Sequence, residues 1–327
     1  MGFIRILLTV FHFIIIALLF GMILNAYIPP EVFGFLNLLP LAFPILIIIN
    51  ILLVLFWIFS WKKRAFIFLL LSMFFVVPTR RWINFSLEKK EKPNLKIISL
   101  NANFGHFGND KIYDFLNQQN ADIVLFQEYD GKKFLDGFHY SENNYPIVKI
   151  QSRFPILESG IVKTAVNTGM CIYADIRING KIIRFVDVYM EPFFIEKKMI
   201  KPNEDMDENE EKMKNVILNQ LIPTFKKHQI QISQIKDFVD QSPYPVIVGG
   251  DFNAVPNSYE YYRISENMDD AFLTSGNGSG TSFHDFKFPL KIDHIFSSKS
   301  IEAISYKVDR SEKISDHFPV LAEFWID

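Results

Sequence analysis

The first quarter of the chain is almost unbroken apolar sequence, and this feature restricts the fold more than any other. From Phe3 to Ile28 only Arg5, His12 and Asn25 interrupt the apolar residues. A helix needs about 20 apolar residues to cross a bilayer, so we predict a first transmembrane helix here. A cleaved signal peptide is the alternative, but this run is longer than the apolar region of such peptides and lacks a clear small-x-small cleavage site.

A second apolar run follows Pro29-Pro30 and extends from about Leu38 to Trp61. It ends with Trp57 and Trp61, and the basic cluster Lys62-Lys63-Arg64 comes directly after it. Interfacial tryptophans followed by basic residues are typical of the point where a helix leaves the membrane. We therefore predict a second transmembrane helix over this run.

A third apolar run, from Ala65 to Val77, is shorter. At about 1.5 Å per residue it covers about 20 Å, whereas the hydrocarbon layer is about 30 Å thick. It spans the layer only if the helix continues past Pro78 and the long side chains of Arg80 and Arg81 reach the interface. Residues 1–83 are therefore predicted to hold two to three transmembrane helices.

The distribution of basic residues predicts the direction in which the helices cross. The first loop has no Lys or Arg and the second has Lys62-Lys63-Arg64, which places that cluster and the amino terminus in the cytoplasm. Three spans, which we expect, put the rest of the chain outside the cytoplasm. Two spans with a cytoplasmic remainder are the alternative, and it is favoured by the basic residues that follow the third run, Arg80, Arg81, Lys89, Lys90 and Lys92.

The part of the chain beyond the apolar runs has a small acidic excess. Of 34 basic and 36 acidic residues, only four and one lie in residues 1–64. Proteins that bind long nucleic acid without sequence preference rely on a basic surface, which this balance does not predict. The single cysteine, Cys171, excludes an intramolecular disulfide and is predicted to lie in the core.

After a charged linker over 84–94, residues 95–327 alternate between strand-like and helix-like segments. The first strand is predicted over 95–100, a helix near 109–120, and the next strand over 122–127. Further on, Asn179-Gly180 favours a two-residue hairpin turn, which makes the strands on either side of it antiparallel.

The segment 203–240 is polar and helical in character, and its acidic run from Glu204 to Glu211 is predicted to be a solvated helix face. Strands are predicted over 244–248, 292–297 and 319–325. Strands joined mostly as hairpins, with helices packed outside, favour an α/β fold: a four-layer sandwich of two mostly antiparallel sheets flanked by helices.

Polar side chains that can bind a metal ion or a phosphate recur where these strands end. Loops at strand ends are where functional sites are usually built. Hydrolysis of a phosphoester needs this mixture of groups, because carboxylates bind a hard divalent cation, amides and histidine bind phosphate oxygens, and a further carboxylate orients the attacking water. The candidates, in chain order, are Asn101, Asn103, Glu128, Asp251, Asn253, Asp293, Asp316 and His317.

Five motifs carry a resemblance to the endonuclease/exonuclease/phosphatase family, which covers residues 95–327. GDFN followed further along by SDH is a strong joint signal, whereas either motif alone is unremarkable. The resemblance implies a catalytic domain that hydrolyses a phosphoester, as a phosphodiesterase or phosphatase, with Mg²⁺ or Mn²⁺. The motifs are SLNANFG at 99–105, LFQEY at 125–129, GGDFN at 249–253, KIDHIF at 291–296 and SDHFP at 315–319.

The resemblance also implies a role for each matching residue on the metal side. Glu128 is similar to the principal metal ligand of the family. Asn101 contributes to the metal and phosphate site beside it. Asp316 is similar to a further carboxylate on the metal side.

The resemblance implies that Asp251 positions or deprotonates the nucleophilic water and that Asn253 binds the phosphate beside it. Their spacing of two directs both side chains to one side if this segment is extended. His317 matches the histidine that contacts the phosphate and acts in acid/base chemistry. Asp293 matches the carboxylate that orients the imidazole, and such a partner fixes the tautomer and favours the imidazolium.

Two positions depart from the family pattern. Many relatives have a histidine where this chain has Tyr189, but some family nucleases use tyrosine there, so Tyr189 is a candidate for contacting the phosphate. Asn103 stands where abasic-site nucleases have an acidic metal ligand, which argues against a specific assignment to DNA repair.

The remaining histidines and one aromatic residue are assigned no role. His294 should point to the opposite face of its strand from Asp293, and Phe283 is predicted to serve packing rather than the site. We also predict that four histidines lie on the surface or in loops, namely His106, His139, His228 and His284.

These observations leave the substrate open. A lipid headgroup, a nucleotide or a nucleic acid each supplies a phosphoester, and the lipid bilayer is a predicted partner through the apolar helices, with no protein partner predicted. A nuclease acting on DNA or RNA is the alternative function within the same chemistry. The alternative from another functional class is a catalytically silent binding module at the membrane. The intact set of site residues argues against it.

Overall fold

Alternating strands and helices follow the apolar segment, as the sequence predicts. The computed structural model describes residues 2–60, 63–87, 89, 91–131, 133–142, 145–166, 170–201, 206–286 and 288–327. The residues Trp61, Lys62, Lys90 and Glu204, named in the predictions above, lie outside the described residues.

Within the described chain the strands are β1 (Ile83–Phe85), β2 (Leu95–Asn101), β3 (Ile123–Gln127), β4 (Tyr140–Glu142), β5 (Val148–Ser152), β6 (Ile156–Ile161), β7 (Met170–Ile178), β8 (Lys181–Tyr189), β9 (Val246–Asp251), β10 (Met268–Asp270), β11 (Asn277–Ser279), β12 (Asp293–Ser298), β13 (Glu302–Val308) and β14 (Val320–Trp325). The α-helices are α1 (Gly2–Ile23), α2 (Pro30–Phe33), α3 (Leu38–Phe59), α4 (Arg64–Ser72), α5 (Val76–Arg80), α6 (Asn109–Gln118), α7 (Lys197–Ile200), α8 (Met206–Val216), α9 (Ile222–Asp240), α10 (Tyr259–Ser265) and α11 (Ala271–Ser275).

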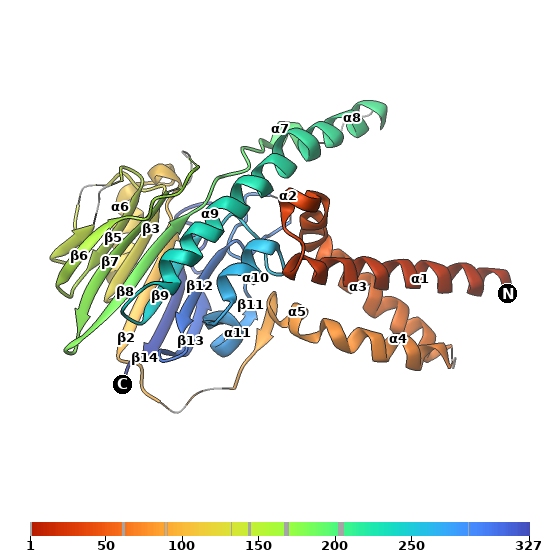
Figure 1. The fold of residues 1–327 in the computed structure, drawn as a ribbon, viewed down its shortest axis with the longest axis horizontal. Coiled ribbons are helices and arrows are strands. Elements are labelled where there is room, and N and C mark those ends of the chain that lie inside the picture. The colour runs from red at the N-terminus through yellow and green to blue at the C-terminus, as the bar shows by residue number, and fades with distance from the viewer. Residues whose placement is uncertain are drawn as a thin grey trace.

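Two six-stranded sheets stand face to face in the part that follows the apolar helices (Figure 1). One sheet has the order β13-β14-β2-β3-β5-β4 and the other the order β10-β12-β9-β8-β7-β6. The pairs β2–β3 and β8–β9 are parallel, and the other described pairs of these sheets are antiparallel. The predicted pair of mostly antiparallel sheets is therefore confirmed.

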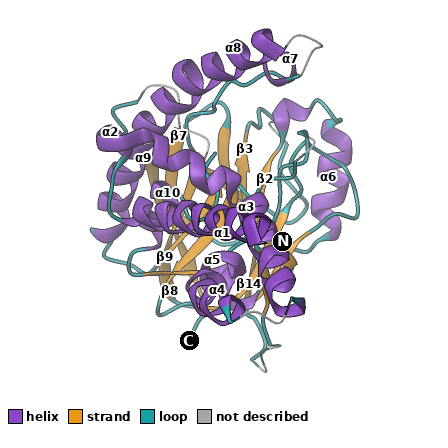
Figure 2. Cartoon of the chain, turned by 90° about the vertical axis from the view of Figure 1, so that its right-hand side faces the viewer, coloured by secondary structure: helices purple, strands orange, loops and turns teal. Residues whose placement is uncertain are grey.

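Helices cover the outer face of each sheet, which completes the four layers (Figure 2). The core between the sheets contains fully buried residues such as Leu125 and Phe185. On the outer face of β8 and β9, Val186 and Val248 pack with residues of α9 and α10. On the other outer face, Phe115 of α6 packs in one cluster with residues of β2 and β3. The predicted four-layer α/β sandwich is confirmed.

The β7–β8 hairpin forms where the sequence predicts it. Asn179 and Gly180 have φ values of +50° and +85°, the left-handed conformation that a two-residue hairpin turn of this kind requires. Cys171 of β7 is 1% exposed and lies in the core beneath α9, as predicted.

The apolar helices project from the sandwich as a separate bundle (Figure 1). By length and composition, Phe3–Ala26 and Pro30–Phe59 are helices that could each cross a membrane. The third run is helical as well, from α4 through the 3₁₀ turn Met73–Phe75 to α5, but it is shorter. α1 leads from the distal end of the bundle to the sandwich, α3 leads away from it, and α4 and α5 return the chain to it.

A buried polar network joins three helices of this bundle. Trp57 donates its indole N–H to His12 Nδ1 at 3.1 Å, so His12 Nε2 is the donor to Asn50 Oδ1 at 3.0 Å. Asn50 in turn donates to Ser72 Oγ at 2.9 Å. Buried side-chain hydrogen bonds of this kind link neighbouring helices in apolar surroundings. α4 is therefore an integral member of the bundle formed by α1 and α3.

Both sandwich-side ends of the bundle are docked on the sandwich. In the 3₁₀ turn before α3, Asn37 donates to both carboxylate oxygens of Glu260 at 3.3 and 3.1 Å and accepts the Tyr259 N–H at 3.1 Å. After α5, Arg81 donates to Asn257 Oδ1 at 2.8 Å. The strand β1 then pairs with β11, so residues 83–85, where the predicted transmembrane segment meets the predicted linker, lie on the sandwich.

α8 and α9 form one long helix interrupted by a π-helical turn, Ile217–Leu221. Pro223 follows directly and has no N–H to donate to the preceding turn, which is a physical reason for the wider turn at this place. The described part of the predicted acidic run lies on α8, where its residues are mostly exposed as expected.

Candidate active site

The strand ends that carry the predicted site residues meet at one end of the sandwich. Asn101 ends β2, Tyr189 ends β8 and Asp251 ends β9, while Glu128 directly follows β3. Parallel neighbours end at the same edge of a sheet, so each parallel pair brings two of these residues together. The antiparallel β12 begins at this edge, where Asp293 lies opposite Asp251.

Gly250 allows the backbone of β9 to approach β8 closely. Its φ is +138°, and a Cβ atom at this position would lie 2.0 Å from the carbonyl oxygen of Val188. Only glycine fits there without displacing the neighbouring strand. The Gly249-Gly250 pair is therefore part of β9 rather than of a tight turn, and it delivers Asp251 to the end of the strand.

Asn253 reaches the site through a turn and not through extended backbone. Its φ is +47°, and its N–H donates to Asp251 Oδ1 at 2.8 Å, the hydrogen bond of an Asx turn. The condition under which a spacing of two directs both side chains to one side, an extended segment, is therefore not met at residues 251–253. The Asn253 amide also donates to Met190 O at 3.0 Å, and the residue lines the same cavity as Asp251.

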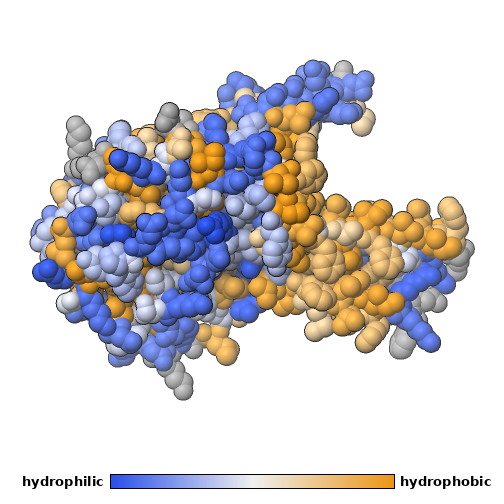
Figure 3. All heavy atoms as spheres, viewed as in Figure 1, coloured by the Kyte–Doolittle hydropathy of each residue, from blue (hydrophilic) through white to orange (hydrophobic). Residues whose placement is uncertain are grey.

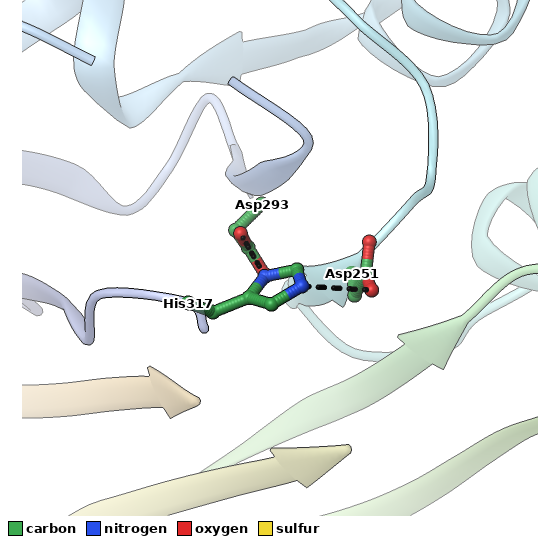
Figure 4. Close-up of side chains that lie close together, drawn as sticks. All are labelled: Asp251, Asp293 and His317. Carbon is green, nitrogen blue, oxygen red and sulfur yellow. Dashed lines mark hydrogen bonds and ion pairs between the residues drawn. The ribbon is translucent and has the colours of Figure 1, made fainter. Parts of the chain in front are cut away.

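His317 lies between two aspartates (Figure 4). Its Nδ1–H donates to Asp293 Oδ2 at 2.8 Å, and its Nε2 lies 3.9 Å from Asp251 Oδ2. Burial disfavours the imidazolium, but Asp293 and then Asp251 outweigh it and raise the pKa of His317 to about 10. A protonated imidazole therefore directs its Nε2–H at Asp251 and the cavity, with Asp293 fixing the ring from behind.

Asp251 is the central carboxylate of the site and is fully buried. Burial raises its pKa to about 7, although His317 acts in the opposite direction. Asn101 donates to Asp251 Oδ2 at 3.0 Å. A carboxylate whose pKa lies near neutrality is well matched to accepting a proton from water.

Glu128 is held by two donors at a single oxygen. Asn101 Nδ2 at 3.1 Å and the Tyr189 hydroxyl at 2.8 Å both donate to Glu128 Oε1. Burial, followed by the nearby Glu128 and Asp251 carboxylates, raises the pKa of Tyr189, so its hydroxyl stays protonated. Glu128 has a φ of +49°, a strained value for a residue of this type that commonly occurs at functional sites.

The carboxylate oxygens at and near Glu128 are suitable ligands for a hard divalent cation. Its carboxylate is half-buried and lines the cavity together with that of Asp316, and both supply the oxygen ligands that Mg²⁺ prefers. A second group, Asp251, Asp293 and His317, offers ligand atoms within 4.8 Å of one another. Asp293 of that group is already bonded to His317 Nδ1, so the Glu128 and Asp316 carboxylates fit a cation better.

A cavity of about 360 Å³ unites these groups. Glu128, Asp251, Asn253 and His317 line it at the strand ends. Asp293, Asn101 and Tyr189 lie behind these residues as their hydrogen-bond partners.

Two predictions about residues outside the motifs are wrong. Phe283 lines the cavity, and its ring centre lies 4.9 Å from that of His317, so it belongs to the site wall rather than to packing alone. His228 is fully buried, where its ring nitrogens lie 3.2 Å from Glu260 Oε1 and 2.7 Å from Glu191 O. Neither residue has a sequence signal that separates it from other residues of its type. His294 does point away from the site, towards Ala254 O, as predicted.

A buried pair beneath the site was not foreseen. Gln127 donates to Asp187 Oδ1 at 2.5 Å, between β3 and β8. Burial raises the pKa of Asp187 well above its usual range. Asp187 and Gln127 thus form a buried polar contact that lies two residues before Tyr189 on one strand and one residue before Glu128 on the other.

Comparison with known proteins gives this fold and site a class. The sequence model of the endonuclease/exonuclease/phosphatase family matches residues 98–317. The chain is thus a four-layer α/β enzyme that hydrolyses phosphoester bonds. It belongs to the endonuclease/exonuclease/phosphatase family. A second model, described as "Domain of unknown function (DUF8431)", matches residues 5–82, which are the apolar helices.

Solved structures share the fold of the sandwich. A family protein from Bacteroides vulgatus is 19% identical, with a TM-score of 0.53 over 72% of this chain and 100% of that one. A mannosyl-6-phosphatase from Bacteroides thetaiotaomicron is 19% identical, with a TM-score of 0.50 over 71% and 100%. The 3′ phosphatase NExo from Neisseria, bound to a product DNA hairpin, is 18% identical, with a TM-score of 0.51 over 71% and 99%. A search of curated proteins found no sequence match.

Proposed function

We propose that this chain is a membrane-anchored, divalent-metal-dependent phosphodiesterase or phosphatase. Residues 1–83 would form the transmembrane segment, 84–94 the linker and 95–327 the catalytic domain. The observation that carries the proposal is the convergence of Glu128 and the Asp251–His317 pair on one cavity. The DNA-bound and sugar-phosphate relatives show how different the substrates on this fold can be, so the fold alone does not choose among them.

Glu128 would hold Mg²⁺ or Mn²⁺, with Asn101 and Asp316 contributing to the same site. The bound cation would neutralise charge on the phosphate oxygens and on the leaving oxygen. Asn101 and Tyr189 keep the Glu128 carboxylate in place by donating to its Oε1.

Asp251 would accept the proton of the attacking water, since burial brings its pKa to about 7. Asn253 would bind a phosphate oxygen from the same side of the cavity. His317, held protonated by Asp293, would donate a hydrogen bond from Nε2 to the phosphate and then a proton to the leaving oxygen.

The anchor and its sidedness are supported by the arrangement of the helices. α1, α3 and the α4–α5 segment run in alternating directions, and the sandwich lies at the opposite end of the bundle from the start of α4 (Figure 1). Together with the basic residues of the second loop, this arrangement supports three spans and an extracytoplasmic catalytic domain.

Hydrolysis of bis-p-nitrophenyl phosphate and p-nitrophenyl phosphate by the full-length protein in detergent tests the proposal. We expect turnover with Mg²⁺ or Mn²⁺ and loss of turnover with a chelator, restored when the metal is added back. The absence of turnover with either metal, or turnover unaffected by chelation, would refute it. Faster hydrolysis of plasmid or single-stranded DNA would replace it with the nuclease function.

A further inference from the structure

The cavity is polar only at its inner end. Beyond the catalytic groups at the strand ends, its walls consist of apolar side chains from five separate segments. These are the first turn of α3 with Leu41, the stretch after β8 with Phe194, the α8 and π-helical region with Met213, the stretch after β9 with Val255, and the stretch before β12 with Phe283 and Ile292.

The charge of the cavity argues against a polyanionic substrate. None of the lining residues that the structure describes is a lysine or an arginine. Nucleic acids and nucleotides carry phosphates or bases that proteins usually bind with cationic side chains and stacking platforms reached from water. An apolar wall next to a phosphoester site instead fits a substrate whose phosphate is attached to a hydrocarbon group.

The apolar wall is continuous with the membrane helices. Leu41 lies in the first turn of α3, one of the two helices long enough to cross a bilayer. Val255 and Ile292 belong to the same buried cluster as Phe43 of α3 and Phe75 between α4 and α5. The catalytic cavity therefore shares a wall with the core of the bundle rather than opening on a distant face.

The rim around the cavity is apolar and exposed. Phe194 is 59% exposed and Met213 is 48% exposed. Phe35, beside α2, and Met213 line a second, shallow hollow next to α8, and its other lining residues include the charged Glu210 and Lys214. Figure 3 shows hydrophobic residues on the flank of the sandwich that faces the bundle, continuing onto the helices. An exposed apolar collar of this kind fits the boundary between headgroups and acyl chains.

We infer that the substrate is a membrane lipid phosphoester, with its hydrocarbon chain in the apolar groove and its phosphorus at the strand ends. This inference rests on the proposed function and adds the substrate class. The lipid enters from the leaflet in which the sandwich-side ends of α1 and α3 lie. In the reaction, the water oxygen forms a new P–O bond and the P–O bond to the leaving alcohol breaks. Asp251 receives the water proton, and His317 supplies a proton to the departing oxygen.

Chain-length dependence tests this inference in the full-length protein in detergent with Mg²⁺. The probes are ethyl and dodecyl p-nitrophenyl phosphate, two diesters that differ only in the alkyl chain, with ethyl and dodecyl phosphate as the monoester pair. Each methylene buried in the groove should raise kcat/KM about three- to fourfold. We expect the dodecyl compound to exceed the ethyl compound by at least about tenfold, since only part of the chain needs to be buried.

Variants at the rim distinguish binding of the alkyl chain in the groove from partition of the substrate into detergent micelles, because that partition is the same for every variant. Phe194→Ser and Met213→Gln should lower the dodecyl-to-ethyl ratio of kcat/KM by about tenfold. Phe134→Ser and Leu157→Gln change residues that are 44% and 43% exposed and do not line the cavity, so they should keep the wild-type ratio.

The outcomes are distinct. Equal kcat/KM for both chain lengths, or rim variants with the wild-type ratio, would overturn the lipid assignment while phosphoester hydrolysis stands. Faster hydrolysis of a single-stranded oligonucleotide than of the dodecyl diester would overturn it as well. Absence of hydrolysis of every probe would refute the proposed function and the lipid assignment with it.

Discussion

Tyr189 occupies a position where the family resemblance suggested contact with the phosphate. In the structure its hydroxyl donates to Glu128 Oε1 at 2.8 Å, and the residue does not line the cavity. A donor behind a metal ligand holds that ligand in place and tunes its affinity for the metal. We therefore regard Tyr189 as a positioning residue for Glu128.

Tyr189→Phe removes this hydrogen bond and retains the ring. We expect the Mg²⁺ concentration that gives half-maximal activity to rise about tenfold or more, because partners behind metal ligands typically contribute that much. Tyr140→Phe, at an exposed position, is the matched control. A raised KM for the substrate with an unchanged Mg²⁺ requirement would show instead that Tyr189 contacts the phosphate.

His294 points away from the site into an apolar pocket formed by Phe252, Tyr261 and Phe296. Burial, reinforced by Lys291, lowers its pKa to about 4. The unfolded chain binds a proton at this residue below about pH 6.5, whereas the folded chain does so only near pH 4. Its contribution to stability is therefore present above pH 6.5 and is lost as the pH falls towards 4.

His294→Gln should make stability less sensitive to acid. The wild-type free energy of unfolding should fall by about 1.4 kcal/mol per pH unit from this residue between about pH 6.5 and 4, and the variant should lack that part of the slope. Denaturant unfolding in detergent at several pH values measures it. The exposed His139→Gln should keep the wild-type slope, and an identical slope in His294→Gln would show that His294 titrates normally.

At the scale of elements, the loop between α1 and α3 is tied to the sandwich through Asn37. This side chain is 1% exposed and bonds both Glu260 and the Tyr259 N–H. His228 contacts the same Glu260 carboxylate. The segment between α1 and α3 and the long helix α9 are thus connected through the one buried carboxylate of Glu260.

Asn37→Ala should loosen this connection. It leaves the Glu260 carboxylate and a buried N–H short of a partner, at a cost of about 1–3 kcal/mol. We expect a decrease of several degrees in the thermal midpoint of the full-length protein in detergent. Asn215→Ala, on the exposed face of α8, should leave the midpoint unchanged. An unchanged midpoint for Asn37→Ala would mean that the loop is not docked in solution.

The strand-end residues could be predicted from the sequence because strands and their terminal polar residues are local features. Glu128, Asp251 and His317 were found in this way, and topology alone brings them together. The backbone conformation at Asn253 could not be predicted in this way, because it depends on a side-chain hydrogen bond from its N–H to Asp251. Phe283 and Leu41 were not predicted either, because the cavity wall depends on packing between distant segments and the chain has many similar apolar residues.

At the scale of the whole molecule, the direction of the helices determines which side of the membrane the site faces. α4, which begins at Arg64, starts at the end of the bundle that is far from the sandwich (Figure 1). If α1 and α3 both cross the bilayer, α4 and α5 must carry the chain back across it. The first loop, between α1 and α3, and the catalytic domain then share the extracytoplasmic side, opposite the basic second loop.

Labelling with a membrane-impermeant maleimide tests this topology, because the native Cys171 is buried and should not react. In intact cells Ser300→Cys, on the exposed surface of the sandwich, should be labelled. Lys63→Cys should react only after the membrane is permeabilised. Labelling of Ser300→Cys only after permeabilisation would instead establish a cytoplasmic catalytic domain, as the two-span alternative predicts.

We propose that Glu128 and His317 act at one metal-dependent phosphoester site. The most direct test is kcat/KM for bis-p-nitrophenyl phosphate with Mg²⁺, measured for the full-length protein and for Glu128→Gln and His317→Asn. We predict losses of at least about a hundredfold in both variants, with wild-type values in the exposed controls Glu91→Gln and His139→Asn. Wild-type activity in either site variant, with the protein folded, would contradict the claim.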